Sequence, residues 1–244
     1  MSGHSHAKKI FGKKQITDAK RGKIFSKFSR QISVAAKEKG GDLETNSGLR
    51  MVIERAKSFN MPKENVEKAI KKGTGELEDV KLENVIFEAY GPGKTAIIIE
   101  GITDNKNRAL GEIKKALSQF DGKLAGEGSV RWMFERKGVI IVNPKPEAQN
   151  PKSKEELELM AIEAGAQDIN WHEDVLDVYT KPEELEKVKN DLKNKGLAIE
   201  STSLDWVAKD QVEISDKEKG SLEKLFESLD ENEAVQEIYS NLKE

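Results

Sequence analysis

Cysteine is absent from all 244 residues of the chain, which excludes disulfides, thiolate zinc sites and a cysteine nucleophile. Histidine occurs only three times, and never with the paired spacing of a helical metal site. No stretch approaches the roughly 20 apolar residues that cross a bilayer, and the polar N-terminal segment lacks the apolar core of a signal peptide. These absences predict a cytoplasmic protein with no membrane partner.

Recognisable catalytic patterns are missing as well. Serine, histidine and acidic residues do not recur in a nucleophilic arrangement. Gly93-Lys94-Thr95 looks like the end of a phosphate-binding loop, but Glu88 stands where the first glycine of that loop is needed. A β-branched run follows Lys94 instead of the helix that would face the phosphates. We therefore expect a protein that is not an enzyme and has no metal, cofactor or small-molecule substrate.

The charge of the chain is divided unevenly along its length. Residues 1–75 contain 18 Lys and Arg and 7 Asp and Glu, a net charge of +11, whereas the remaining residues carry −14. Nine of the basic residues lie among the first 30 residues, where Asp18 is the one acid. This asymmetry predicts a basic segment that binds a polyanion, attached to an acidic body.

The hydrophobic pattern changes its period after residue 75. Residues 2–16 have no hydrophobic period and predict an extended, mobile arm. Apolar residues at helical spacing then predict three helices, over 18–39, 47–60 and 62–73. Alternating segments then predict strands over 85–90, 95–101 and 129–135, with a helix over 107–120. Further on, strands over 139–143, 168–172, 175–180 and 198–206 and helices over 154–164 and 183–195 give the ferredoxin-like order βαββαβ. In the last segment, residues 208–244, the pattern predicts a strand over 211–214 and helices over 216–229 and 231–242.

These elements predict an α+β protein of three domains. The first is a basic three-helix domain of residues 1–75, including the mobile arm. The second is a middle α/β domain of residues 76–135, which has too few elements by residue 135 and is completed by residues 208–244. The third is a ferredoxin-like domain of residues 136–207, inserted into the middle one.

The basic stripe of the first domain is the strongest functional signal. Lysine and arginine can neutralise phosphates and release counterions, which supplies affinity without base specificity. A solvated helix face is the alternative, but this run lacks alternating acids. Polar residues at the start of the helix over 107–120 are further candidates, with helix capping as their alternative role. The predicted nucleic-acid contacts are His4, Lys8, Lys9, Lys13, Lys14, Lys20, Arg21, Lys23, Lys27, Arg30, Lys63, Lys71, Lys72, Asn105, Asn107 and Arg108.

Several longer motifs resemble the YebC/PmpR family along nearly the whole chain. Near the start of the chain they are Gly3-His4-Ser5 and Asp18-Ala19-Lys20-Arg21-Gly22-Lys23-Ile24-Phe25, and around the predicted third helix they are Met61-Pro62-Lys63-Glu64-Asn65 and Lys71-Lys72-Gly73-Thr74-Gly75. In the middle of the chain they are Tyr90-Gly91-Pro92-Gly93, Thr103-Asp104-Asn105-Lys106-Asn107-Arg108, Gly128-Ser129-Val130 and Met133-Phe134-Glu135-Arg136-Lys137-Gly138. Near the end the motif is Val235-Gln236-Glu237-Ile238-Tyr239-Ser240-Asn241. The sequence departs from the family in the arm: His6-Ala7 replaces a common Lys-Trp, and Gly12-Lys13-Lys14 replaces a His-Arg-Lys run.

The resemblance implies a cytoplasmic, non-catalytic protein of three domains with the third inserted in the second. It also implies a transcriptional regulator that binds promoter DNA. The alternative within the same family is a translation factor that binds ribosomal RNA on the ribosome and assists difficult peptide bonds, such as those in proline runs. An alternative of another class is a protein-interaction module whose basic domain binds an acidic partner.

Overall fold

The computed structural model describes residues 18–77, 81–144, 152–172 and 174–243, and for residues 18–20 it describes the backbone only. Residues 134–209 form one compact unit, and the described residues before 134 together with 210–243 form another. Helices and two antiparallel sheets alternate along the chain, so the predicted α+β class is confirmed. The predicted three-domain boundaries stay a proposal. No helix in the described ranges has the length and apolar character that a membrane span requires.

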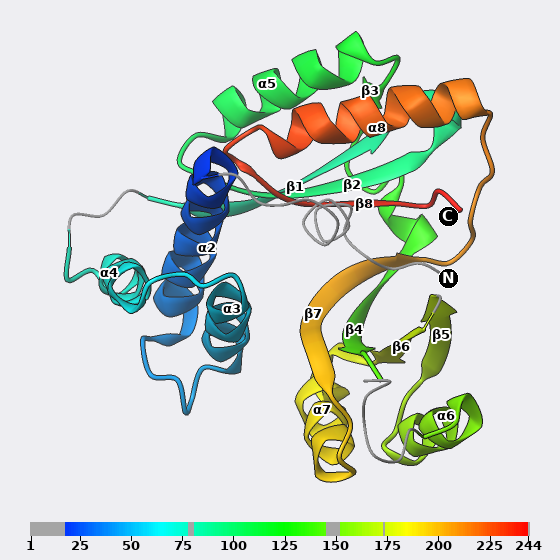
Figure 1. The fold of residues 1–244 in the computed structure, drawn as a ribbon. Coiled ribbons are helices and arrows are strands. Elements are labelled where there is room, and N and C mark those ends of the chain that lie inside the picture. The colour runs from blue at the N-terminus through cyan, green and yellow to red at the C-terminus, as the bar shows by residue number, and fades with distance from the viewer. Residues whose placement is uncertain (1–17, 78–80, 145–151, 173, 244) are drawn as a thin grey trace. The chain divides into compact units, whose positions relative to one another are not determined.

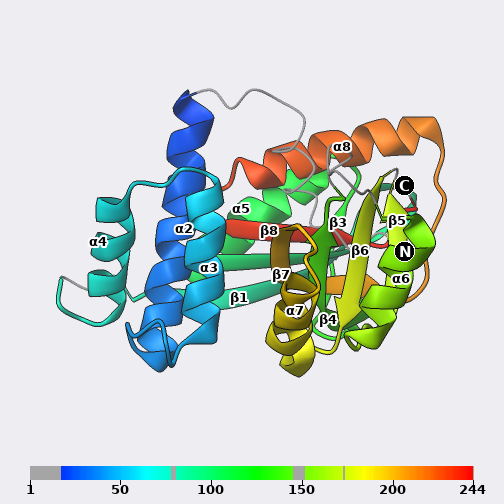
Figure 2. The ribbon, with the colours of Figure 1, turned by 60° about the horizontal axis from the view of Figure 1, so that its bottom comes forward.

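Three helices form the first part of the larger unit (Figure 2): α2 (Asp18–Lys39), α3 (Ser47–Ser58) and α4 (Lys63–Gly73). Their apolar stripes pack into one core around Phe28, Ile32 and Leu49. The buried Asn46 side chain joins the first two helices. Its amide oxygen caps α3 at Leu49, and its amide nitrogen donates to the carbonyls of Ala35 and Gly40.

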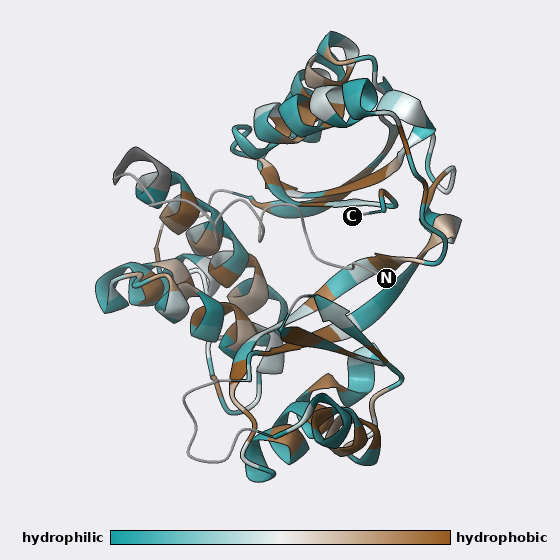
Figure 3. Cartoon of the chain, turned by 45° about the vertical axis from the view of Figure 1, so that its right-hand side comes forward, coloured by the Kyte–Doolittle hydropathy of each residue, from teal (hydrophilic) through white to brown (hydrophobic). Residues whose placement is uncertain are grey.

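A sheet with two helices on one face completes this unit. Its strands are β1 (Glu83–Tyr90), β2 (Ala96–Thr103), β3 (Lys123–Leu124) and β8 (Val235–Ser240), in the order β3-β1-β2-β8. The helices α5 (Lys106–Gln119) and α8 (Asp216–Asp230) lie side by side over the sheet, as Figure 1 shows. Figure 3 shows the brown, hydrophobic residues along the strands and teal on much of the two helices. The buried core between them contains Phe87, Ile99, Ile113 and Phe226.

Residues 134–209 form the second sheet and its helices. The elements follow as β4 (Phe134–Val142), α6 (Lys154–Glu163), β5 (Asp168–His172), β6 (Val175–Thr180), α7 (Leu185–Asn194) and β7 (Ile199–Ala208). The sheet order is β5-β6-β4-β7, and all pairings are antiparallel. This is the βαββαβ arrangement that the sequence predicted for the inserted segment.

Three predicted elements were wrong. The predicted helix over 231–242 is the strand β8, which pairs with β2 from the distant middle of the chain. The predicted strand over 129–135 is a turn and a 3-10 helix, η2 (Arg131–Met133), after which β4 begins. The predicted strand over 211–214 is reduced to one bridge between Val212 and Leu242. For β8, pairing with a strand far away in the sequence decided the conformation, and local periodicity does not report such pairing. The loop before β4 is held instead by hydrogen bonds to the buried Glu88 carboxylate.

The carboxylate of Glu88 holds a loop against the face of the first sheet that α5 and α8 leave open. Glu88 is 3% exposed and accepts hydrogen bonds from the backbone N–H groups of Gly128 (2.8 Å), Val130 (2.8 Å) and Arg131 (3.0 Å). Burial alone would raise the pKa of Glu88, but these N–H groups and the Arg131 guanidinium outweigh it and lower the pKa. The charged carboxylate is therefore the form that fixes this loop.

We predict that Glu88→Gln lowers the free energy of unfolding by about 1–3 kcal/mol at pH 7, because the new amide group faces N–H donors in a buried site. Because the pKa of Glu88 is lower in the folded protein than in the unfolded chain, the charged group stabilises the fold at pH values above its unfolded pKa. This stabilisation is lost as the pH falls through the folded pKa. The difference between the two proteins in urea unfolding should therefore shrink below about pH 4. The control Glu223→Gln changes an exposed residue of α8 and should have little effect. A difference that stays constant down to pH 3 would contradict this role of the charge.

Candidate nucleic-acid interface

Helices α2 and α4 approach each other closely because small residues lie at their contact. A Cβ atom at Gly73 would clash with the backbone carbonyl of Ser33, so glycine is required at the end of α4. The Ser33 hydroxyl, which is buried, donates to the carbonyl of Ala69 at 2.8 Å. This close contact fixes the spacing of the longer side chains on either side of it.

A basic groove follows this helix contact. It consists of two adjoining hollows of about 350 Å³ and about 530 Å³, which share Ser29, Arg30, Lys72 and Glu233 in their lining. Five cationic side chains line the groove, along with the carboxylates of Asp104 and Glu233. The cations are Arg30, Lys37, Lys68, Lys72 and Arg108. The groove thus has an excess of positive charge and suits an anionic ligand.

The five cations of the groove differ in whether a carboxylate of the protein already pairs with them. Lys37, Lys68 and Lys72 are exposed and form no ion pair with any described residue. Arg108 forms an ion pair with Asp104, one turn earlier on the same segment. Arg30 donates to the Glu233 carboxylate at 2.9 Å and to its backbone carbonyl at 2.6 Å. The three lysines are consequently the groove's most available partners for phosphate.

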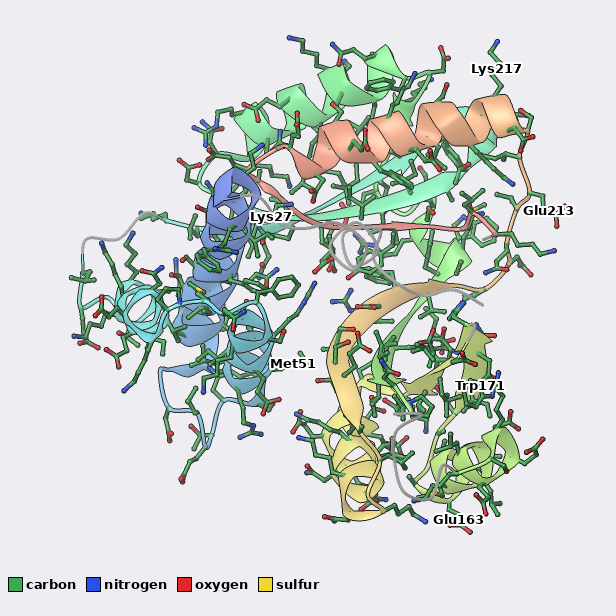
Figure 4. All side chains as sticks on the ribbon, viewed as in Figure 1. Lys27, Met51, Glu163, Trp171, Glu213 and Lys217 are labelled. Carbon is green, nitrogen blue, oxygen red and sulfur yellow. The ribbon has the colours of Figure 1, made fainter. Side chains whose placement is uncertain are left out.

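The inner side of α2 and the side of α3 carry cations that join the helices to the C-terminal segment. The Lys27 ammonium lies 2.6 Å from the Asp230 carboxylate, and its side chain is only 12% exposed. Figure 4 labels Lys27 on α2, beside the segment that leads from α8 into β8. Arg55 of α3 lies 2.6 Å from Glu237 of β8 and over the ring of Phe28. Basic residues of this part therefore serve the packing of the unit as well as its surface.

The predicted contacts fall into several groups in the structure. Arg30, Lys72 and Arg108 line the groove together. Arg21 and Lys23 are exposed near the start of α2. Lys71 is exposed on α4, and Lys63 pairs loosely with Glu67 at 3.4 Å on the same helix. The arm residues His4, Lys8, Lys9, Lys13 and Lys14 and the side chain of Lys20 lie outside the described part.

The polar residues before α5 are explained in part by helix capping. The Asn105 side chain accepts a hydrogen bond from the Arg108 backbone N–H at 3.0 Å, which is the alternative role expected from the sequence. Asn107 is exposed in the first turn of the helix. Two groove cations, Lys37 and Lys68, were not predicted. Their helical spacing from Arg30 and Lys72 was a usable signal, since residues seven or four apart share one face.

Within the described ranges, no group of three or more His, Asp or Glu side chains could hold a metal ion. The groove presents lysine and arginine side chains of the protein itself to a ligand. Its chemistry is the neutralisation of negative charge by lysine and arginine.

Comparison with known proteins assigns the chain to a family. A model described as the TACO1/YebC protein N-terminal domain matches residues 5–76, and one described as the TACO1/YebC second and third domain matches residues 82–242. The chain belongs to the TACO1/YebC family. The resemblance inferred from the sequence motifs is thereby confirmed, and the basic groove lies mainly in the part that the first model matches.

Similar proteins include two named probable transcriptional regulatory protein. The one from Caldanaerobacter subterraneus subsp. tengcongensis is 44% identical over 242 residues, which cover 99% of this chain and 98% of that protein. The one from Thermotoga maritima is 44% identical over 241 residues, which cover 99% and 93%. The crystal structure of a conserved hypothetical protein from Aquifex aeolicus is 42% identical, with a TM-score of 0.84 over 93% of this chain and 91% of that one.

We predict that Asp230→Asn lowers the free energy of unfolding by about 1–3 kcal/mol, because the Lys27 ammonium, whose side chain is only 12% exposed, loses the carboxylate that neutralises it. Urea unfolding at pH 7 measures the change. The matched control is Glu227→Gln, which removes the same charge from an exposed position of the same helix. Equal effects of the two substitutions would show that net charge alone is responsible, against the specific role of Lys27.

Proposed function

We propose that this protein is a cytoplasmic, non-catalytic regulator of gene expression that binds promoter DNA through the basic groove and the exposed start of α2. The observation that carries the proposal is the basic groove, in whose two adjoining hollows Lys37, Lys68 and Lys72 have no carboxylate partner among the described residues. The names of the relatives, which are those of transcriptional regulators, favour DNA as the nucleic acid.

The contacts in this proposal are mainly with the phosphate backbone. Lysine ammonium groups act as point charges towards phosphates and carry no sequence information. The arm and the start of α2 extend the same surface, with Lys8, Lys9, Lys13, Lys14, Lys20, Arg21 and Lys23. His4 belongs to the proposed contacts of the arm, and Lys63, Lys71, Asn105 and Asn107 to those at the margins of the groove. A backbone-reading surface of this kind gives affinity first and obtains specificity from DNA shape or from a partner.

We predict a strong dependence of affinity on salt. If about six phosphates are contacted, log affinity should fall against log salt with a slope near −5 on duplex DNA. The combined substitution of Lys20, Arg21 and Lys23 by alanine should flatten the slope by about 2 to 3, measured by fluorescence anisotropy with a labelled duplex. The matched control replaces Lys114, Lys115 and Lys224, three exposed lysines of α5 and α8. An equal flattening by the control, or an unchanged slope in the first variant, would place the site elsewhere.

The physiological ligand is identified by ultraviolet crosslinking in growing cells, followed by sequencing of the attached DNA and RNA. Enrichment of defined promoter DNA, lost in the Lys20, Arg21 and Lys23 variant, is the expected result. Enrichment of one compact ribosomal RNA site would replace the proposal with the translation-factor alternative. Absence of any crosslinked nucleic acid, with an acidic protein recovered instead, would favour the protein-interaction module.

A further inference from the structure

A further hollow of the larger unit lies at the start of helix α8, away from the basic groove. Its volume is about 570 Å³, and it is lined by the turn η1 (Pro92–Lys94), by Asp121 and Lys123, and by the first turn of α8. The groove instead includes Glu233, beyond the other end of α8, and the 15 residues of this helix span about 22 Å. The two sites share none of the described residues that line them.

Three exposed lysines line this hollow, and they come from segments far apart in the sequence. Lys94 ends η1, Lys123 begins strand β3, and Lys217 lies in the first turn of α8. Figure 4 shows Lys217 projecting from its helix. None of the three forms an ion pair with a residue in the described ranges. Three such ammonium groups around one hollow favour an anionic ligand.

Two carboxylates also line the hollow, and one of them is already engaged. Glu218 accepts hydrogen bonds from the Ser215 hydroxyl at 2.6 Å and from its backbone N–H at 2.9 Å, as part of the capping box of α8. Asp121 is exposed and is the remaining competitor for the lysines. With three cations against two carboxylates, the side chains of the hollow keep a net positive charge.

The turn that carries Lys94 is packed tightly against the segment before α8. Gly93 has a φ of 64°, and a Cβ atom there would lie 2.5 Å from the Cγ2 atom of Ile214, so only glycine permits this approach. On the neighbouring strand, Lys123 pairs with Tyr90, just before the turn. The backbone at two of the lysines is thus held by the fold, and it is chiefly their side chains that must be ordered when a ligand binds.

We propose that this hollow binds a phosphate group through Lys94, Lys123 and Lys217. Ammonium groups bind phosphate as point charges, with charge-assisted hydrogen bonds that are stronger than neutral ones. The site is not a nucleotide-binding loop, because strand β2 rather than a helix follows Lys94, and side chains from three segments hold the ligand. Two sources supply a phosphate group, a free phosphorylated molecule and a nucleic-acid backbone. The inference goes beyond the proposed function, since no groove residue takes part.

The test uses the whole chain, whose lack of cysteine allows a single reporter dye to be attached at the hollow. Ser221→Cys, at a position that lines the hollow, carries an environment-sensitive fluorophore. Ser58→Cys, at an exposed position at the end of α3, carries the same dye as the control. Inorganic pyrophosphate and a DNA duplex are titrated separately. Pyrophosphate should change the fluorescence at position 221 until it saturates, and leave the dye at position 58 unaltered.

Asp121→Asn is the most informative variant, because it should gain affinity, which a damaged fold would not produce. It removes the competing carboxylate, and asparagine accepts the φ of 56° at this position. Pyrophosphate affinity should rise about 2- to 5-fold, the range expected for one exposed charge pair. The matched control, Glu223→Gln, removes the same charge from an exposed position of α8 outside the hollow and should have little effect.

Lys94→Gly removes one ammonium group without strain, because glycine favours the φ of 59° that Lys94 adopts. Its melting temperature should stay the same or rise, while pyrophosphate affinity falls about 2- to 5-fold. Combined with Lys123→Ala and Lys217→Ala, the loss should reach about 10-fold or more. The matched control replaces the exposed residues Lys114, Lys115 and Lys224 by alanine.

The two probes distinguish the sources of the phosphate. Saturable binding of pyrophosphate that depends on the three lysines supports the site with a free phosphorylated molecule as its ligand. A response to the duplex alone, with the same dependence, supports the site with a nucleic-acid backbone as its ligand. No response at position 221 to either probe, or equal losses in the two triple variants, would overturn the inference. Failure of the proposed function is measured separately, in the Lys20, Arg21 and Lys23 variant, which leaves the hollow unchanged.

Discussion

Three ion pairs join helices α2 and α3 of the larger unit to its C-terminal segment: Arg55 with Glu237, Lys27 with Asp230, and Arg30 with Glu233. Glu237 of β8 lies directly across from Glu100 of β2, so two like charges oppose each other on one face of the sheet. The Arg55 guanidinium, 2.6 Å from Glu237 and 19% exposed, offsets this repulsion from the helical side. Removal of one member of such a pair leaves an uncompensated charge in a poorly solvated place, and that is costly. On α2, Lys27 and Arg30 form their ion pairs with Asp230 and Glu233, between the end of α8 and the start of β8.

The ion pairs of α2 also shape the groove. Arg30 reaches Glu233 there, and Arg108 in the first turn of α5 lines the same hollow as Lys72 of α4. The uneven charge of the chain then has a structural account. Acids of the C-terminal segment neutralise the inner side of α2 at Lys27 and Arg30, whereas Lys23, Lys37, Lys68 and Lys72 remain exposed. A phosphate in the groove must compete with Glu233 for Arg30, whereas no carboxylate of the described residues pairs with the three groove lysines.

The sequence could predict features that depend on neighbouring residues, but not features that depend on contacts between residues far apart in the chain. The helices of the first part were predictable because their signals are local: the apolar stripe of α2, Pro62 before α4 and Gly73 at its end. Strand β8 was not, since Val235 and Ile238 are three residues apart and fit a helix equally well. Only pairing with β2 makes them a strand. The basic stripe predicted which part of the chain would bind a polyanion. It could not show that Lys27 faces Asp230, or that Lys37 and Lys68 share a groove, because both depend on how the helices meet.

The most direct test of the central claim is ultraviolet crosslinking of the purified protein to duplex DNA, followed by mass spectrometry of the protein–nucleotide adducts. The account predicts that adducts map to α2 and α4, within residues 18–39 and 63–73, and that they diminish as salt is raised. Adducts confined to residues 134–209, or a yield that does not depend on salt, would contradict the claim that the basic groove is the nucleic-acid interface.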